Sequence, residues 1–286
     1  METRVSSATK EVVIGDGQPT VLIGERINPA GKKNLSEALK SGNLDIVRSE
    51  AMAQAQVGAD IIDINVSAFG LDDVSLLPQA VQAAMDAVEV PLCLDSANPE
   101  ALAAALKVYK GKPLINSVTG EEHSLKKVLP LVKEYGAAVI GLVQDDEGIP
   151  KNSERRVAIA RKIVERAEAV GIPREDVIID CMAFAIGAEA SSGAAVIDSI
   201  RRIKTELGVN LTLGASNISF GMPDRDLLNN TFVAMAIAAG VTSLIVDASR
   251  VRPAVLAADL ITGRDKGARR YIEEYRQRRS LQKPGA

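Results

Sequence analysis

The stretch VPLCLDSANPEALAAALKVYKGKPLINSV, residues 90–118, decides the fold class. An apolar run ends at Asp95, a helical run rich in Ala and Leu follows, and a second apolar run ends at Asn116. Asn98 suits the position that caps this helix, and Pro99 suits its first turn. The spacing predicts a strand–helix–strand unit whose two strands both end in a short polar side chain. In parallel units of this kind, ligands bind at the carboxyl ends of the strands.

The same pattern recurs along the chain. Apolar runs begin near residues 20, 59, 90, 113, 137, 177, 211 and 242, and helical segments separate them. Eight strands alternating with helices over roughly 250 residues predict an α/β fold, the (β/α)8 TIM barrel, in a single domain of residues 1–286. A doubly wound open sheet is the alternative. It would normally have fewer strands and a Gly-rich phosphate loop after the first, and GERINPAG does not match GxGxxG.

Two segments flank the predicted barrel. Residues 1–19 carry a Gly-Asp-Gly-Gln-Pro turn between two apolar runs, which predicts a small hairpin covering the N-terminal mouth of the barrel, or a frayed arm. Residues 264–286 are charged and predict a C-terminal helix and tail.

The composition excludes several function classes. Among the 286 residues, 47% are hydrophobic, 25% are charged and 3% are aromatic, which is typical of buried parallel strands covered by Ala-rich helices. A net charge of −3 gives no electrostatic argument for nucleic-acid binding. No apolar run is long enough for a membrane span. Cys93 and Cys181 lie inside predicted strands, and the N-terminus has no apolar core of a signal peptide. A cytoplasmic protein is expected.

The predicted strand ends form a ring of acids and amides. Its members are Glu25, Asp63, Asn65, Asp95, Asn116, Gln144, Asp180, Asn217 and Asp247. The single histidine, His123, is expected at the surface, so the chain has too few histidines to favour a zinc site or a Ser-His-Asp triad. Carboxylates could hold Mg²⁺, but a ring this rich in amides favours hydrogen-bonded recognition of a flat heterocycle such as a pterin. No bound metal is expected.

Several motifs resemble one known family. LIGERIN, IIDINVS, LCLDS, INS, AAVIGL, GIPK, IID, GASNISF and NNTFVAMAIAAG occur in the order seen in methyltetrahydrofolate:corrinoid methyltransferases. The chain also resembles the folate domain of cobalamin-dependent methionine synthase and, more widely, the pterin-binding barrels that include dihydropteroate synthase. The resemblance covers about residues 21–250 and spans seven strands.

The resemblance implies roles for individual residues. Asp95, Asn116 and Asp180 match the side chains that bind the pterin edge. Asn217 matches the amide that contacts N5, the nitrogen bearing the methyl group, and is the expected catalytic residue. Arg225 matches a basic position after that loop. Glu25, Asn28, Asp63 and Asn65 lie in matching motifs and are expected to support the pocket, as are Gln144 and Asp247 from the ring of strand ends.

The implied reaction moves the N5 methyl group of methyltetrahydrofolate to a Co(I) corrinoid, or the reverse. No Asp-x-His-x-x-Gly motif for cobalamin is present, so the corrinoid is expected on a separate protein. The family likeness and the apolar segment FVAMAIAAG also predict a homodimer. Two alternatives stay open, a dihydropteroate synthase-like enzyme and a non-catalytic folate-binding subunit. Against the synthase, no Arg or Lys follows the seventh predicted strand before Arg225.

Overall fold

Short runs rich in Val, Ile and Leu form the eight parallel strands of a closed barrel. The computed structural model describes residues 1–282, so the end of the predicted C-terminal tail, 283–286, lies outside the described residues. The strands are β3 (Val21–Ile27), β4 (Ile61–Asn65), β5 (Leu92–Asp95), β6 (Leu114–Thr119), β7 (Ala138–Leu142), β8 (Val177–Asp180), β9 (Asn210–Thr212) and β10 (Ser243–Val246). They pair in the order β10-β3-β4-β5-β6-β7-β8-β9. Ile245 N–H donates to Leu213 O at 3.0 Å and closes the ring, which confirms the predicted (β/α)8 barrel.

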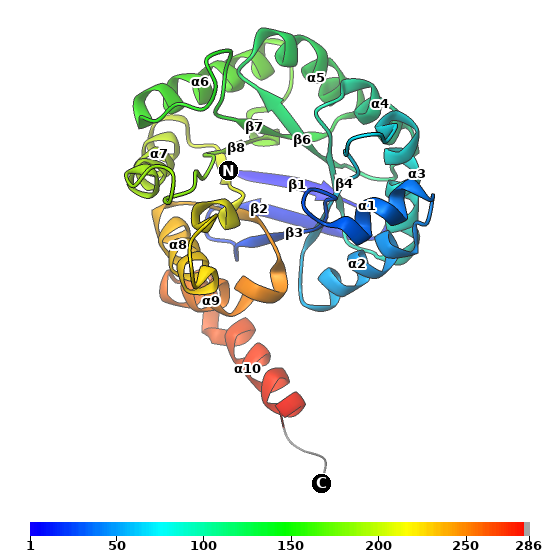
Figure 1. The fold of residues 1–286 in the computed structure, drawn as a ribbon. Helices are drawn as coiled ribbons and strands as arrows, with labels where there is room; N and C mark the ends of the chain where they lie inside the picture. The colour runs from blue at the N-terminus through cyan, green and yellow to red at the C-terminus, as the bar shows by residue number, and fades with distance from the viewer. Residues whose placement is uncertain (283–286) are drawn as a thin grey trace.

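Ten α-helices lie in the described part of the chain, and most of them surround the barrel (Figure 1). They are α1 (Lys33–Lys40), α2 (Asp45–Gln56), α3 (Asp73–Ala87), α4 (Pro99–Val108), α5 (Glu122–Tyr135), α6 (Ser153–Ala169), α7 (Ser192–Leu207), α8 (Arg225–Ala239), α9 (Ala248–Ile261) and α10 (Arg269–Gln282). Three short 3-10 helices complete the set: η1 (Arg174–Asp176), η2 (Ala215–Ser219) and η3 (Lys266–Ala268). The C-terminal helix α10 projects away from the barrel in Figure 1. Within residues 1–282, no helix has the length and apolar character needed to cross a membrane.

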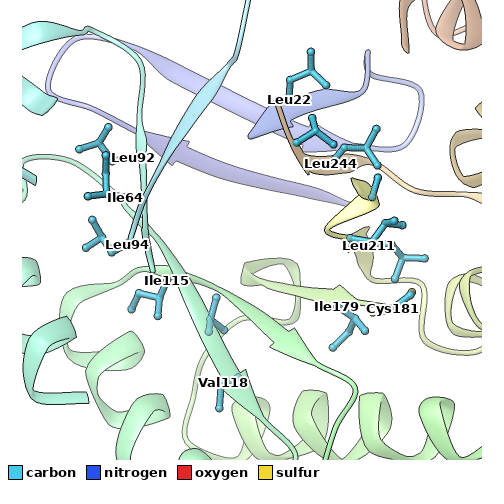
Figure 2. Packing of buried hydrophobic residues seen from close by; sticks show 14 of the residues in the cluster. Leu22, Ile64, Leu92, Leu94, Ile115, Val118, Ile179, Cys181, Leu211 and Leu244 are labelled. Carbon is cyan, nitrogen blue, oxygen red and sulfur yellow. The ribbon is translucent and has the colours of Figure 1, made fainter. Parts of the chain in front are cut away.

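Every barrel strand except β9 contributes to two apolar layers, because successive side chains of a strand point to opposite faces. On β3, Leu22 belongs to the layer between strands and helices, whereas Ile23 belongs to the barrel interior. On β8 the same alternation separates Ile179 from Ile178. Figure 2 shows labelled members of the strand–helix layer on successive strands. Both layers exclude water from the strands, so polar strand residues can reach solvent only at the two ends of the barrel.

The N-terminal segment closes one end of the barrel. Strands β1 (Glu2–Ser6) and β2 (Glu11–Gly15) form an antiparallel hairpin, so the prediction of a hairpin is confirmed. Val5 and Ile14 are fully buried and join the apolar cluster of the barrel interior. Asn210, at the start of β9, donates from Nδ2 to Ile14 O at 2.9 Å. The hairpin therefore covers the N-terminal mouth and is not a frayed arm.

The hairpin does not turn at the Gly-Asp-Gly-Gln-Pro segment, so the predicted turn is wrong. The Gly-Asp-Gly-Gln-Pro segment links β2 to β3, and the hairpin itself turns at residues 7–10, where Ser7 N–H donates to Lys10 O at 2.9 Å. The short segment Glu2–Ser6 pairs because alternate side chains, Thr3 and Val5, are buried under the barrel. Burial by the rest of the fold decides a strand that its own composition does not predict.

The seventh barrel strand is shorter than expected. It was predicted to end at Asn217, but β9 ends at Thr212. Asn217 lies instead in η2, where its own N–H donates to Gly214 O at 3.3 Å. The chain therefore turns before Asn217, so this side chain stands over the strand ends rather than in the strand.

Candidate functional site

Three neighbouring strands bring polar side chains together at the C-terminal mouth. The parallel register pairs Asn65 of β4 with Asp95 of β5, and Asp95 with Asn116 of β6. Asn65 Nδ2 donates to Asp95 Oδ2 at 2.9 Å, and Asn65 Oδ1 accepts from Ser67 N–H at 2.9 Å. Asn65 therefore fixes the orientation of the Asp95 carboxylate across the strand boundary.

Asp63 lies beneath this row and is completely buried. Its Oδ1 accepts from Asn116 Nδ2 at 3.5 Å, whereas its Oδ2 has no hydrogen-bond partner among the described residues. Burial raises the pKa of Asp63 well above its ordinary range, and the nearby carboxyl groups of Asp95 and Glu25 raise it further. A buried polar atom without a partner is rare in a folded protein, and this oxygen is left with free acceptor capacity.

Asp95 has a smaller shift with the same main cause. Burial raises the pKa of Asp95 to about 6, the hydrogen bond from Asn65 opposes the rise, and the charge of Glu25 adds to it. Near neutral pH, this carboxyl is therefore poised to accept hydrogen bonds from a ligand or to exchange a proton with it.

Asp180, the last residue of β8, is the carboxyl group on the other side of the mouth. Its Oδ1 accepts from Met182 N–H at 2.6 Å, and Gly214 N–H also bonds to the carboxylate. Burial raises the pKa of Asp180 to about 7, although both backbone bonds favour the charged form. This group can change its protonation state near pH 7 when a charged or hydrogen-bonding ligand arrives.

A cavity of about 440 Å³ joins Asp180 to Asn217. The side chain of Asn217 is exposed and has no hydrogen-bond partner among the described residues. A Cβ atom at Gly214 would lie 3.1 Å from Asn217 Nδ2, so glycine at this position gives the amide its room. Asn217 is therefore available to donate to or accept from a group bound in the cavity.

Arg225 lies next to this cavity but bonds to the loop that carries Asn217. Its Nε donates to Ser219 Oγ at 3.0 Å and a terminal nitrogen donates to Ser216 O at 2.9 Å. Its guanidinium also lies 5.5 Å from the centre of the Phe220 ring. These contacts hold η2 in place.

Of the other predicted residues, Glu25 lies near enough to Asp63, Asp95 and Asp180 for its charge to raise their pKa values. Its Oε1 accepts from Asn28 Nδ2 at 3.1 Å, and Asn28 Oδ1 accepts from Ala30 N–H at 3.0 Å. Burial raises the pKa of Glu25, whereas the hydrogen bond from Asn28 and the charge of Lys32 lower it.

Two predicted residues bond to partners outside the predicted site. Gln144 Nε2 donates to Glu121 Oε1 at 3.4 Å. Asp247 caps α9, accepting from Ser249 N–H at 3.1 Å and from Gln54 Nε2 at 3.1 Å. Burial alone would raise the pKa of Asp247, but the hydrogen bonds from the Ser249 hydroxyl and Gln54 and the charge of Arg26 outweigh it and hold the pKa below its ordinary value.

Sequence reasoning missed the aromatic side chains of the mouth. The chain has only four Phe residues, and Phe184 and Phe220 line the cavity beside Asp180 and Asn217. Phe69, in the loop after β4, is 99% exposed. Large apolar residues in loops after strands were the available signal, because such loops carry ligand contacts in barrels of this kind.

The C-terminal mouth offers hydrogen-bonding carboxylates and amides. Within residues 1–282, no three His, Cys, Asp or Glu side chains lie close enough together to hold a metal ion. His123 is exposed on α5, as predicted. Carboxylates on two sides of the mouth accept paired N–H donors, and amides beside them donate and accept.

Comparisons with known proteins show the family of the chain. A model of the family described as pterin binding enzyme matches residues 24–247. A methylcorrinoid:tetrahydrofolate methyltransferase of Eubacterium limosum is 32% identical over 267 residues, which cover 90% of this chain and 96% of that protein. Methionine synthase of Mycobacterium tuberculosis is 32% identical over 265 residues, covering 88% of this chain but 22% of the synthase.

Solved structures show the same fold at lower sequence identity. Dihydropteroate synthase from Xanthomonas albilineans, in complex with 7,8-dihydropteroate, superposes with a TM-score of 0.70 at 18% identity, covering 91% of this chain and 98% of that one. The synthase from Yersinia pestis gives a TM-score of 0.69 at 15% identity, covering 88% and 96%.

Proposed function

The chain belongs to the pterin-binding enzyme family, and from this premise we propose that it transfers a methyl group between N5 of methyltetrahydrofolate and the Co(I) corrinoid of a separate protein. The observation that carries the proposal is the cavity in which Asp180 and the unpaired amide of Asn217 meet. The 32% identity to a methylcorrinoid:tetrahydrofolate methyltransferase, over nearly the full length of both chains, supports it. That relative is named for transfer from corrinoid to folate, and in this proposal the same site serves both directions.

The pterin edge binds to the strand ends. A pterin presents a 2-amino group, N3–H and N8–H as donors, with N1 and the 4-oxo group as acceptors. In this proposal the donors face the carboxylates of Asp95 and Asp180, and the amide of Asn116 satisfies the acceptor beside them. Glu25, Asn28, Asp63 and Asn65 support this row from behind. Arg225 contributes by holding the loop of Asn217.

Asn217 acts at the reacting nitrogen. Co(I) attacks the methyl carbon with its electron pair, the C–N5 bond breaks, and N5 keeps the bonding pair. Without a proton, N5 would have to leave as an amide anion, which is a poor leaving group, so N5 must carry a proton or a strong hydrogen bond. The NH2 group of Asn217 donates to neutral N5, and its carbonyl accepts from N5–H⁺ once a proton has arrived. The open mouth lets a corrinoid protein bring its metal over the methyl group.

One assay separates this function from its alternatives. Methyltetrahydrofolate and Co(I) cobalamin are mixed with the protein, and the Co(I) absorbance is followed. We expect Co(I) to be consumed and methylcobalamin to form, with no reaction when the protein is omitted. Folate binding without methyl transfer would identify a non-catalytic subunit. Condensation of a pterin pyrophosphate with aminobenzoate would identify a dihydropteroate synthase-like enzyme.

We propose that the working unit is a homodimer joined through α7 and α8. A groove of about 680 Å³ lies between these helices, and Leu227 and Met235 on its α8 side are 63% and 53% exposed. Light scattering is expected to give the mass of a dimer for the wild type and of a monomer for Met235→Asp. Ile261→Asp, at an exposed apolar residue of α9 outside the groove, is the control and should stay dimeric. A monomeric wild type at micromolar concentration would contradict the proposal.

We also propose a cytoplasmic location and no requirement for a bound metal. The buried, unpaired thiols of Cys93 and Cys181 are consistent with a cytoplasmic protein. The chain is proposed to need no metal of its own. Loss of activity with a chelator, restored by a divalent ion, would overturn this.

A further inference from the structure

A buried arginine lies directly behind Asp180. Arg156 belongs to the first turns of α6 and is 2% exposed. Its Nε donates to Pro150 O at 2.8 Å, and one terminal nitrogen donates to Cys181 O at 2.8 Å and Met182 O at 3.1 Å. Within the described residues, no carboxylate forms an ion pair with it. A buried cation without a paired carboxylate is costly, so its position requires an explanation.

The carbonyl groups that Arg156 binds belong to the backbone that holds Asp180. Cys181 and Met182 follow Asp180 directly, and Met182 N–H donates to its carboxylate. Met182 has φ of 51°, in the left-handed region that non-glycine residues rarely adopt. Such a conformation persists only where surrounding contacts enforce it, and the two hydrogen bonds from Arg156 supply that constraint. The orientation of the Asp180 carboxylate thus depends on the guanidinium behind it.

Arg156 also acts on the charge of Asp180. The charged groups that face Asp180 are Arg156 from α6, which favours its ionised form, and Glu25 from β3, which opposes it. The ionised carboxylate is the form that accepts N–H donors from a ligand. Arg156 therefore supports recognition both by fixing geometry and by favouring the accepting state.

We propose that Arg156 is a positioning residue for ligand recognition, which ties the loops after β7 and β8 together and holds Asp180 ready to accept the N–H groups of a pterin. The inference rests on the proposed function. It assigns a role to a side chain that touches neither the ligand nor the reacting atoms.

Arg264 offers a matched control at the opposite end of the barrel. Its terminal nitrogens donate to Val241 O at 2.7 Å and Ile237 O at 3.0 Å, and to Thr20 Oγ1 at 2.9 Å. Burial lowers the pKa of both arginines. The two guanidinium groups therefore do similar structural work, but only Arg156 is connected to Asp180.

The experiment compares Arg156→Lys, Arg156→Gln and Arg264→Lys with the wild type by calorimetric titration of methyltetrahydrofolate between pH 6 and pH 8. Lysine keeps the charge but lacks the planar guanidinium with its paired N–H donors, and glutamine lacks the charge. We expect Arg156→Lys to bind at least about 10-fold more weakly, the effect of losing one charge-assisted hydrogen bond, with an unchanged pH midpoint. In Arg156→Gln the midpoint should also move to higher pH. Arg264→Lys should melt earlier and bind folate like the wild type.

Three results would overturn the proposal. The first is wild-type affinity and pH midpoint in both Arg156 variants. The second is a loss of affinity in Arg264→Lys equal to the loss in Arg156→Lys. The third is failure of both Arg156 variants to fold while Arg264→Lys folds. The last two would make the residue purely structural. A wild-type protein that binds no folate would instead contradict the proposed function, so the two failures are distinguishable.

Discussion

Aspartates before and within the same barrel strands have different hydrogen-bond partners. Asp60 precedes β4 and accepts from Leu22 N–H at 2.9 Å, and Asp176 precedes β8 and accepts from Lys112 Nζ at 2.6 Å. Further along these strands, Asp63 in the middle of β4 has an oxygen without a partner, and Asp180 at the end of β8 is bonded only by backbone N–H groups. On these two strands, the aspartate before the strand links elements of the fold, whereas Asp63 and Asp180 are left with acceptor capacity.

Asn210 of β9 and Asn217 of η2 show a similar contrast. Asn210, at the start of β9, donates to Thr3 Oγ1 and Ile14 O, both at 2.9 Å, and so ties the hairpin to the barrel. Asn217 stands over the mouth without a hydrogen-bond partner among the described residues. Side-chain type alone therefore does not identify a candidate functional residue, because the NH2 group of Asn210 is bonded within the fold whereas the side chain of Asn217 is not.

The largest expected effect comes from these two asparagines. Asn217→Ala should lower the single-turnover rate of methyl transfer by about 10²–10³-fold, because the amide stabilises charge that develops on N5. Its melting temperature should change little, since the side chain is exposed. Asn210→Ala should show the reverse, with normal transfer and a lower melting temperature. Single-turnover kinetics at saturating methyltetrahydrofolate, beside melting curves, checks both. A normal rate in Asn217→Ala would mean that another group activates N5.

A smaller effect is expected in the pH dependence of stability. The folded-state pKa values of Asp180 and Asp95, about 7 and about 6, lie above the value of 3.8 for a free aspartate, so the folded state binds protons more tightly than the unfolded chain. Stability from these groups is present at low pH and is lost as pH rises through about 6 to 7. Denaturant unfolding of the ligand-free wild type should therefore lose on the order of 2–3 kcal/mol relative to Asp180→Asn between pH 5 and pH 8. Parallel pH profiles for the two proteins would remove Asp180 as the cause.

The smallest effect is expected at the N-terminal end. Lys112→Met removes the partner of Asp176 and should lower the free energy of unfolding by about 1–2 kcal/mol without changing the rate of methyl transfer. The double variant Lys112→Met/Asp176→Asn leaves no unpaired charge and should recover part of this loss. Urea unfolding of the three proteins provides the test. A change in transfer rate would show that the two ends of the barrel are not independent.

The sequence predicted the fold and most of the mouth because both follow from a local rule, a polar side chain at each strand end. Asp95 and Asn116 lie on adjacent strands as expected, since short connections fix neighbouring strands in order. The placement of Asn217 failed by a few residues, because Gly214 and η2 are set by contacts with Asp180 and β10 rather than by local propensity.

Arg156 could not be recognised from its neighbours in the sequence. In SERRVAIARK it looks like another charged residue of a surface helix, and its neighbour Arg155 does form ion pairs, with Asp145 and Glu147. Only the packing of α6 against the loops after β7 and β8 buries one of the two arginines. Tertiary contacts of this kind carry no periodic signal.

The contrast between the ends of one strand is tested most directly on β8. Methyltetrahydrofolate is titrated calorimetrically into the wild type, Asp180→Asn and Asp176→Asn under the same conditions. We predict that Asp180→Asn loses about 1–3 kcal/mol of binding free energy, because the N–H donors of the pterin lose a charged acceptor, and that Asp176→Asn binds like the wild type. Equal affinities in all three proteins, or the larger loss in Asp176→Asn, would contradict the assignment of the ligand to the C-terminal mouth.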